Sequence, residues 1–556
     1  MRKIYFKFIV VFLISLTILA CGGSKSVGEL PDISDISKID TLRIKHNDSS
    51  YSIGKNTLNK NKYGIWELYV EGDALERGMV NGSLTRELMD KQEVAFMNKL
   101  ESMVPSKTYQ KFLSKLIAYF NRKIDSHITT EYKQEIFGIS RFTLRKYDTF
   151  APAYKRALYL HGAHDIGHAL QDLMLVGCTS FAAWDNKTAN GQLLVGRNFD
   201  FYAGDEFSKE KIVAFFNPSK GHKFMIYTWG GFVGAVSGMN EFGLTVTLNA
   251  GKSKIPLVAK TPISLVAREI LQYATTTQQA IEIAAKREVF VSESIMVGSA
   301  KENKAILIEV SPSNFGVFEV ENSNQLICSN QFQSEEYTFD KRNLETITQS
   351  HTAYRFKKMQ ELVSQTNKLT PEKAVDILRN RQGLDGIKLG MGNEKAINQL
   401  LAHHGIVFQP QERKVWISAN PYQLGAFIAY DLDEVFERFE KDNVRGSVAN
   451  FEEVIGEDPF MRTEQFHNYE EYRKLKLKVV EGLKKGTNLS EQEILRLSHL
   501  NPNYWEAYSL AGLYYFQKKE YKKAIINFKQ AKRREVTTLP DVKYLDKMTA
   551  KAYRKL

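Results

Sequence analysis

The chain has 556 residues, 43% of them hydrophobic and 25% charged, which is long enough for two or three globular domains with a sizeable core. Its net charge is +12, but lysine and arginine are spread along the sequence and no nucleic-acid-binding module accompanies them. The charge therefore argues for solvated helix faces and against nucleic acid as a partner.

Residues 1–21 have the pattern of an export signal. Three basic residues come first, and an apolar run from residue 8 to residue 20 follows, which is too short for a comfortable membrane span. The run ends in "ILAC", which resembles a bacterial lipobox and implies acylation of Cys21. An ordinary secretion signal is the alternative. The lipobox predicts a lipid-anchored protein of the bacterial cell envelope, and the "GGSKS" that follows favours the outer membrane.

The next two segments differ in pattern. Residues 22–61 are polar with little periodicity, which predicts a flexible tether. Residues 62–177 begin with a strand-like "GIWELYVEG" and continue as amphipathic stretches, which predicts a mainly helical segment. Its "HGAHDIGH" places His161, His164 and His168 on one helical face. No HExxH motif or further ligand accompanies them, so we expect a polar face, no metal site and no cofactor.

Residues 178–432 change to short runs rich in β-branched and aromatic residues, punctuated by Gly, Asn and Asp. Two helical patterns, at 262–274 and 276–287, interrupt them, and further helices are expected from about Thr352. The strands are expected to end near residue 432. Strands, two helices and strands again predict a layered α+β domain with two sheets.

Residues 433–556 are charged and helical, and no further strands are expected there. "EAYSLAGLYYFQKKEYKKAIINFKQAK" resembles a tetratricopeptide unit, with Gly512 and Tyr515 in the first helix and Ala524 and Phe528 in the second. A plain helical hairpin packed on the preceding α+β domain is the alternative. A repeat of this kind would make the region a candidate site for a protein partner.

A cysteine preceded by glycine, Gly177-Cys178, stands where the β-rich region starts. Cys178 alone could be a small buried hydrophobe, and a disulfide with Cys328 would silence it. If the chain breaks at Gly177–Cys178, however, Cys178 becomes an amino terminus. Its α-amine, with a pKa of about 7.7–8.0, can then take the proton of a thiol with a pKa of about 8.5. The cysteine would carry its own base.

Five further residues lie where such a nucleophile needs them. Arg197 and Asp200, in "GRNFDF", are one hairpin downstream and could return to Cys178, where Asp200 accepts from the amine and Arg197 favours the thiolate. A structural ion pair is the alternative for these two. Asn249 and Asn330 end strands and could donate to an oxyanion, or could be turn residues. Arg355 stands at a helix start and could support the site.

These motifs, in this order, resemble autoproteolytic N-terminal-nucleophile hydrolases. "GCTS", "GRNFDF", "MNEFGLTVTLN" and "SNQF" are most similar to the acyl-coenzyme A:6-aminopenicillanic-acid acyltransferase family, with bile-salt hydrolases as relatives. The resemblance covers roughly residues 64–432. It implies a four-layer αββα sandwich, here followed by the all-α tetratricopeptide-like region, and a precursor that cuts itself before Cys178. "SNQF" departs from the many relatives that have a histidine after the asparagine.

The resemblance also implies a reaction. Cys178 would be nucleophile and base, Arg197 and Asp200 would orient it, Asn249 and Asn330 would form the oxyanion hole, and Arg355 would support the site. We expect hydrolysis or transfer of small acyl amides through an acyl-cysteine, with water as the default acceptor outside the cell. The alternatives are a lipid-ester hydrolase of the phospholipase-B-like kind and a non-catalytic lipoprotein that binds partners through its helical repeats.

Overall fold

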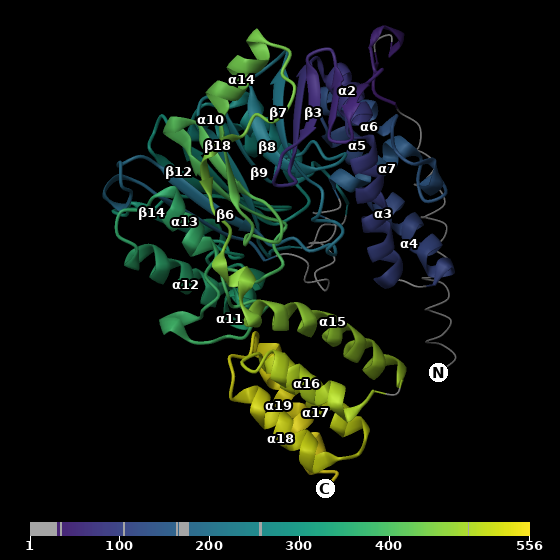
Figure 1. Ribbon diagram of the computed structural model, residues 1–556, viewed down its shortest axis with the longest axis vertical. Coiled ribbons are helices and arrows are strands. Elements are labelled where there is room, and N and C mark those ends of the chain that lie inside the picture. Colours follow the sequence, from purple (N-terminus) through teal and green to yellow (C-terminus); the bar gives the residue numbers. More distant parts are fainter. Residues whose placement is uncertain are drawn as a thin grey trace.

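The computed structural model describes residues 30–33, 36–103, 106–162, 165, 177–254, 258–487 and 489–556 (Figure 1). The predicted lipidation site Cys21 and two of the three clustered histidines, His164 and His168, lie outside these residues. None of the helices in the described ranges combines the length and the apolar character that a membrane crossing demands.

Two β-sheets form the centre of the molecule. The larger has 11 strands in the spatial order β1 (Ile44–Asn47), β2 (Ser50–Ile53), β3 (Asn56–Lys60), β4 (Trp66–Gly72), β7 (Lys211–Pro218), β8 (Phe224–Trp229), β9 (Ser237–Asn240), β10 (Leu244–Ala250), β11 (Glu293–Ser299), β12 (Lys304–Ser311) and β13 (Asn314–Phe318). The smaller has seven: β14 (Gln325–Cys328), β5 (Thr179–Ala183), β6 (Leu194–Phe199), β15 (His404–Gln409), β16 (Lys414–Ser418), β17 (Phe427–Asp431) and β18 (Asn450–Ile455).

The sheets pack face to face, and helices cover their outer faces. Between the sheets, side chains of the large sheet such as Phe215 and Met296 meet side chains of the small sheet such as Ile406 and Ile417. The outer face of the large sheet is covered by α2 (Ala74–Leu84), α9 (Ile263–Tyr273) and α10 (Thr277–Ala285). The outer face of the small sheet is covered by α12 (Thr352–Gln365) and α13 (Pro371–Leu378). This arrangement confirms the predicted two-sheet α+β fold with an αββα layering.

The segment before Cys178 is mainly helical but also completes the large sheet. Its helices are α2, α3 (Arg86–Met103), α4 (Lys107–Phe120), α5 (Ile124–His127), α6 (Thr130–Ser140) and α7 (Ala153–His161). Its strand β4 pairs in parallel with β7, from Trp66 opposite Ile212 to Gly72 opposite Pro218. The sheet therefore joins residues on both sides of the predicted cleavage point.

The tether predicted for residues 22–61 is wrong for residues 44–60, which form β1, β2 and β3. Ile53 and Leu58 are buried in the core beneath α2, and Gly54, with a φ of +56°, turns β2 into β3. The polar side chains of this hairpin obscured the pattern, since Thr57 and Asn59 are buried as well. Strand pairing, rather than a continuous apolar face, holds these residues in place.

The predicted end of the strands near residue 432 is also too early. After α14 (Leu432–Lys441), the strand β18 pairs with β17 and completes the small sheet. Two of the six residues in its sequence "NFEEVI" are charged and none of its side chains is fully buried, as befits an edge strand. An edge strand lacks the alternation of apolar residues on which the prediction relied.

The remainder of the chain is helical, as predicted, and Figure 1 shows these helices (yellow-green to yellow) beyond one end of the sheets. The helices are α15 (Glu464–Lys485), α16 (Glu491–Leu500), α17 (Trp505–Gln517), α18 (Tyr521–Lys532) and α19 (Leu539–Tyr553). The predicted hairpin is α17–α18, in which Gly512 admits the ring of Phe528; a Cβ at Gly512 would lie 2.5 Å from that ring. Its tetratricopeptide identity stays a prediction.

Candidate active site

Cys178 lies directly before β5 and is completely buried. Just upstream, the amide of Gly177 donates to the carbonyl of Asp200 at 3.0 Å, which extends the antiparallel pairing of β5 with β6 by one further step. The predicted hairpin return is therefore present, because strand pairing places "GRNFDF" against Gly177 and Cys178. The thiols of Cys178 and Cys328 are both free.

Arg197, on β6, points its guanidinium at the Cys178 thiol, with 3.6 Å between Nη2 and Sγ. Its Nη1 donates to the carbonyl of Val236 at 2.6 Å and to the hydroxyl of Ser237 at 2.5 Å, and its Nη2 also donates to the carbonyl of Leu248. These three acceptors belong to the large sheet or to the turn that leads into it, so Arg197 reaches across the interface between the sheets. The side chain is held rigidly beside the sulfur.

Arg355 joins the backbone of Cys178 to Asn330. Its Nη1 donates to the Cys178 carbonyl at 2.8 Å and to the Thr179 hydroxyl at 2.6 Å, and its Nη2 donates to Oδ1 of Asn330 at 2.5 Å. The side chain comes from the first turn of α12 and is fully buried. Asn330, two residues after the end of β14, donates in turn to the Ala250 carbonyl at 2.9 Å.

Asn249 reaches the site from the large sheet through Ser180 and Cys328. Its Oδ1 accepts from the Ser180 hydroxyl at 2.7 Å, and its Nδ2 donates to the Cys328 carbonyl at 3.3 Å. All six predicted side chains thus gather around the start of β5: five come from the small sheet, the residues next to its strands or its flanking helix, and Asn249 comes from the large sheet. Their catalytic roles stay predictions.

Burial dominates the electrostatics of this cluster. It raises the pKa of the Cys178 thiol to about 11, while the charge of Arg197 opposes the shift. Burial also raises the pKa of Asp200 to about 8, and Arg355 and Arg197 pull it down. Glu293, buried at the start of β11, is held mainly neutral by desolvation, which raises its pKa well above the usual range. Two arginines and two high-pKa carboxyls therefore surround the thiol.

Sequence reasoning missed Gln399. This buried residue lies in an irregular segment before β15, and its Nε2 is 3.3 Å from both the Gly177 carbonyl and Oδ2 of Asp200. Its neighbourhood, "INQLLAHHG", carries no periodic or turn signal that marks a functional residue. Only the tertiary placement of the segment reveals it.

A buried histidine pair contacts Ser237, one of the hydrogen-bond acceptors of Arg197. His404 contacts the Ser237 hydroxyl at 2.9 Å through Nε2, and its Nδ1 is 2.9 Å from Nδ1 of His403. Burial lowers the pKa of both imidazoles well below the usual range, so they are neutral.

His161, the described member of the histidine cluster, has a structural environment. Its Nε2 accepts from the Val233 amide at 3.0 Å, and its Nδ1 is 2.8 Å from the Ala157 carbonyl. Burial lowers the pKa of His161 to about 4. The ring therefore bridges α7 to the turn after β8.

An apolar cavity begins at Phe201, the residue after Asp200. Its volume is about 60 Å³. Helices α3, α6 and α7 of the upstream segment form one wall, and aromatic side chains from the part of the chain after Cys178 form the other: Phe201, Phe207, Trp229 and Phe232. The cavity thus lies between the parts of the chain before and after Cys178.

Comparison with known proteins identifies relatives for the central part of the chain. Residues 186–421 match the family described as acyl-coenzyme A:6-aminopenicillanic acid acyl-transferase, which confirms the predicted resemblance for this segment. An uncharacterised protein of Archaeoglobus fulgidus is 26% identical over 278 residues, covering 46% of this chain and 45% of that protein. The N-acylethanolamine-hydrolyzing acid amidase of Caenorhabditis elegans is 25% identical over 195 residues, covering 34% of this chain and 52% of that protein.

The chain spans about half the length of the curated relatives it matches. Among solved structures, the Caenorhabditis elegans amidase ortholog is 19% identical, with a TM-score of 0.31 over 42% of this chain and 93% of that chain. A variant of the conjugated bile acid hydrolase from Clostridium perfringens is 12% identical, with a TM-score of 0.33 over 49% of this chain and 96% of that chain.

Proposed function

We propose that this protein is an N-terminal-nucleophile amidohydrolase that cuts its own chain between Gly177 and Cys178 and then hydrolyses small acyl amides. The observation that carries the proposal is the buried cluster around Cys178, in which Arg197 faces the thiol and Arg355 holds the Cys178 carbonyl at 2.8 Å. The match of residues 186–421 to an acyltransferase family supports the same class of chemistry.

Self-cleavage starts with the thiol of Cys178 in the uncut chain. The sulfur adds to the Gly177 carbonyl, and the thiol proton passes to a neighbouring base; Asp200, with a pKa near 8, is matched to that task. The carbon–nitrogen bond then breaks, the Cys178 nitrogen takes up a proton, and a thioester remains. Water hydrolyses the thioester, which leaves a carboxylate on Gly177 and frees both the thiol and the α-amine of Cys178.

The mature enzyme repeats this chemistry on a substrate. The free α-amine of Cys178 takes the thiol proton, the sulfur attacks the amide carbonyl, and the protonated amine then protonates the leaving nitrogen. An acyl-cysteine and a free amine result, and water releases the acid. Arg197 stabilises the thiolate, and the amides of Asn249 and Asn330 are neutral donors for the oxyanion.

The apolar cavity at Phe201 supports an apolar acyl group. Aromatic and aliphatic side chains line it, and burying each methylene of an acyl chain contributes about 0.8 kcal/mol. The cavity adjoins Phe201, the residue that follows Asp200, and we propose that it holds the acyl group of the substrate. An acyl amide with a short apolar chain is therefore the substrate class we propose.

Terminal sequencing of the purified protein tests the proposal. We expect two fragments on a denaturing gel, the second beginning at Cys178, and a single full-length band from Cys178→Ala. Acyl amides, bile-salt conjugates and phospholipids, offered as a panel, then distinguish amide from ester chemistry. A wild-type chain that stays as intact as Cys178→Ala would contradict the proposed self-cleaving amidohydrolase. It would favour a protein that binds partners through its C-terminal helices.

We propose, from the predicted lipobox, that the enzyme is anchored at the cell envelope through Cys21. Two or more acyl chains give a stable anchor where one is marginal. Fractionation of the expressing bacterium tests this: we expect the wild-type protein in the membrane fraction and the Cys21→Ala protein outside it. Wild-type protein that washes off in buffer would contradict the anchor.

A further inference from the structure

The side-chain amide of Gln399 contacts the bond that the proposed self-cleavage breaks. Its Nε2 lies 3.3 Å from the Gly177 carbonyl oxygen, and within the described part of the chain Gln399 is the group that donates to this oxygen. The two residues are closely packed: a Cβ placed on Gly177 would lie 3.0 Å from the same nitrogen. Gln399 is 2% exposed, so water does not compete for the carbonyl.

We propose that Gln399 is the oxyanion donor of self-cleavage, an inference that rests on the proposed function. When the Cys178 thiol adds to the Gly177 carbonyl, the carbonyl oxygen gains a negative charge. A neutral amide N–H that already points at this oxygen then forms a stronger hydrogen bond, and a buried site enhances the effect. The donor acts when the thiol adds to the carbonyl and when the tetrahedral intermediate breaks down to the thioester. It takes up and releases no proton or electron, so the balance of the reaction is unchanged.

A second contact orients the amide. Nε2 of Gln399 also lies 3.3 Å from Oδ2 of Asp200, so one amide group contacts both the scissile carbonyl and the carboxyl that we propose as base. A primary amide has two N–H groups, which suffices for both acceptors. The Asp200 carboxyl thus fixes the orientation in which the Gln399 amide directs an N–H at the Gly177 carbonyl.

The segment that carries Gln399 is held by an unusual backbone. Leu400 is fully buried and has a φ of +55°, in the left-handed region that a leucine seldom adopts. Its amide donates to Oδ1 of Asn398 at 2.9 Å, and the Asn398 amide donates to the Asn380 carbonyl at 2.8 Å. Strain of this kind persists only where the surroundings fix it, and it turns the Gln399 side chain toward Gly177.

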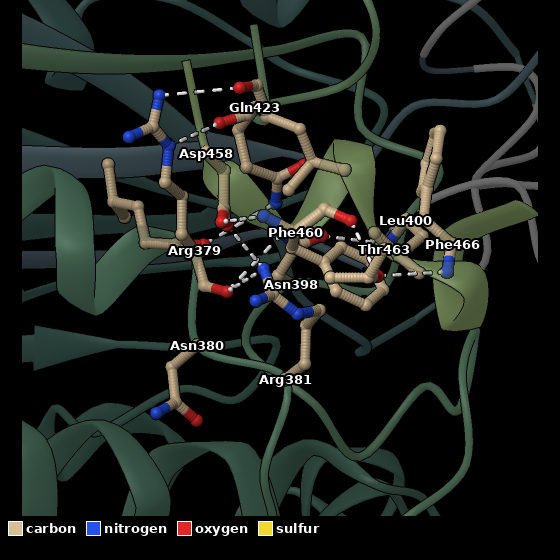
Figure 2. Close-up of polar contacts among 12 residues, drawn as sticks. Arg379, Asn380, Arg381, Asn398, Leu400, Gln423, Asp458, Phe460, Thr463 and Phe466 are labelled. Atoms are coloured by element: carbon tan, nitrogen blue, oxygen red, sulfur yellow. Dashed lines mark hydrogen bonds and ion pairs between the residues drawn. The ribbon is translucent and has the colours of Figure 1, made fainter. Parts of the chain in front are cut away.

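The C-terminal helical region supplies part of those surroundings. Leu400 packs within the hydrophobic cluster of the C-terminal helices, and the Tyr469 hydroxyl of α15 donates to its carbonyl at 3.3 Å. Figure 2 shows the junction, where Asn398 and Leu400 lie among Arg379 and the residues that lead into α15, including Asp458 and Phe460. Helices remote in sequence therefore help to hold the proposed donor in place.

Cleavage rates of the full chain test the inference. The chain is synthesised in a cell-free system, labelled in a short pulse and sampled over time on denaturing gels. We expect Gln399→Ala to cut itself about 100- to 1,000-fold more slowly than wild type, the usual effect of removing one oxyanion donor. The matched control is Gln423→Ala, which removes another buried glutamine, one that donates to the Leu378 carbonyl, and should keep the wild-type rate.

The variant Gln399→Glu distinguishes a role of this residue as hydrogen-bond donor from a purely structural role. A protonated carboxyl can donate to the oxygen and an ionised one cannot, so this variant should cut itself faster as the pH falls, relative to wild type at each pH. A pH dependence identical to that of wild type, or a wild-type rate for Gln399→Ala, would overturn the inference while self-cleavage itself stood. A wild-type chain that stays uncut would instead overturn the proposed function and this inference with it.

Discussion

At the scale of single residues, the burial of charge defines this site. Arg197 and Arg355 are both fully buried, and each directs a guanidinium at Cys178, one at the sulfur and one at the carbonyl. Arginine suits such a place because it stays protonated and its fork of donors can satisfy several oxygens. Arg355, which the sequence offers only as a residue at a helix start, donates directly to the Cys178 carbonyl.

Asn249→Ala should reduce turnover of the mature enzyme about 100- to 1,000-fold, because the proposed oxyanion loses a fixed neutral donor. The measurement is kcat on an acyl amide, per titrated Cys178 thiol, so that loss of folded protein does not enter. Asn240→Ala is the matched control: Asn240 is also buried, but it donates to the carbonyls of Leu271 and Ala274 at the C-terminal end of α9. An unchanged kcat for Asn249→Ala would remove that residue from the oxyanion hole.

Lys211 makes stability depend on pH. Burial lowers the pKa of this lysine to about 7, whereas in the unfolded chain a lysine keeps its proton up to about pH 10.4. Unfolding therefore takes up a proton between these values, and Lys211 makes the free energy of unfolding rise with pH, by up to about 1.4 kcal/mol per unit.

Replacing Lys211 by methionine should remove that rise. The measurement is urea unfolding between pH 7 and pH 9.5, made on chains that also carry Cys178→Ala so that every molecule is uncut. Lys209→Met, two residues away and largely exposed, should keep the wild-type slope. Equal slopes for Lys211→Met and its parent would show that the buried amine does not titrate in this range.

At the scale of elements, strand pairing brings the predicted residues together. Cys178, Arg197 and Asp200 were found from the sequence because a hairpin of known register, β5–β6, places them side by side. Gln399 could not be found in this way, since its position depends on an irregular segment and on a helix more than sixty residues later. The polar hairpin β2–β3 and the charged edge strand β18 were missed because pairing, not apolar alternation, defines them.

Tyr469→Phe should slow self-cleavage about two- to tenfold, because it removes one hydrogen bond to the Leu400 carbonyl while keeping the ring. The measurement is the pulse-labelled cleavage rate. Tyr514→Phe is the control, since the Tyr514 hydroxyl makes a similar bond, to the Leu489 carbonyl at 3.3 Å, within the helical region. If both variants cut at the wild-type rate, α15 does not position Gln399.

At the scale of the whole molecule, the two predicted fragments share one β-sheet and a buried ion pair. Strand β4 of the upstream fragment pairs with β7 of the downstream fragment along its full length. Glu135, upstream, pairs with Arg268, downstream, at 3.3 Å, and both side chains are fully buried. Separating the fragments would expose a sheet interior and leave buried charges without partners.

We therefore expect the fragments to remain together after cleavage. Gel filtration of the mature protein without denaturant should give one peak that contains both chains, and only denaturant should resolve them. A free upstream fragment in native buffer would contradict this. Cys178→Ala, which cannot cut itself, marks the elution volume of the undivided molecule.

The parallel ladder of β4 and β7 has a consequence for how the protein is made. Once the ladder has formed, its hydrogen bonds hold the two halves together without the peptide bond before Cys178. That bond then ensures only that the two halves are made in equal amounts. Two messages, one for each half, should then give the same assembled molecule, and removal of the initiator methionine from the second half would expose the thiol and α-amine of Cys178 without self-cleavage.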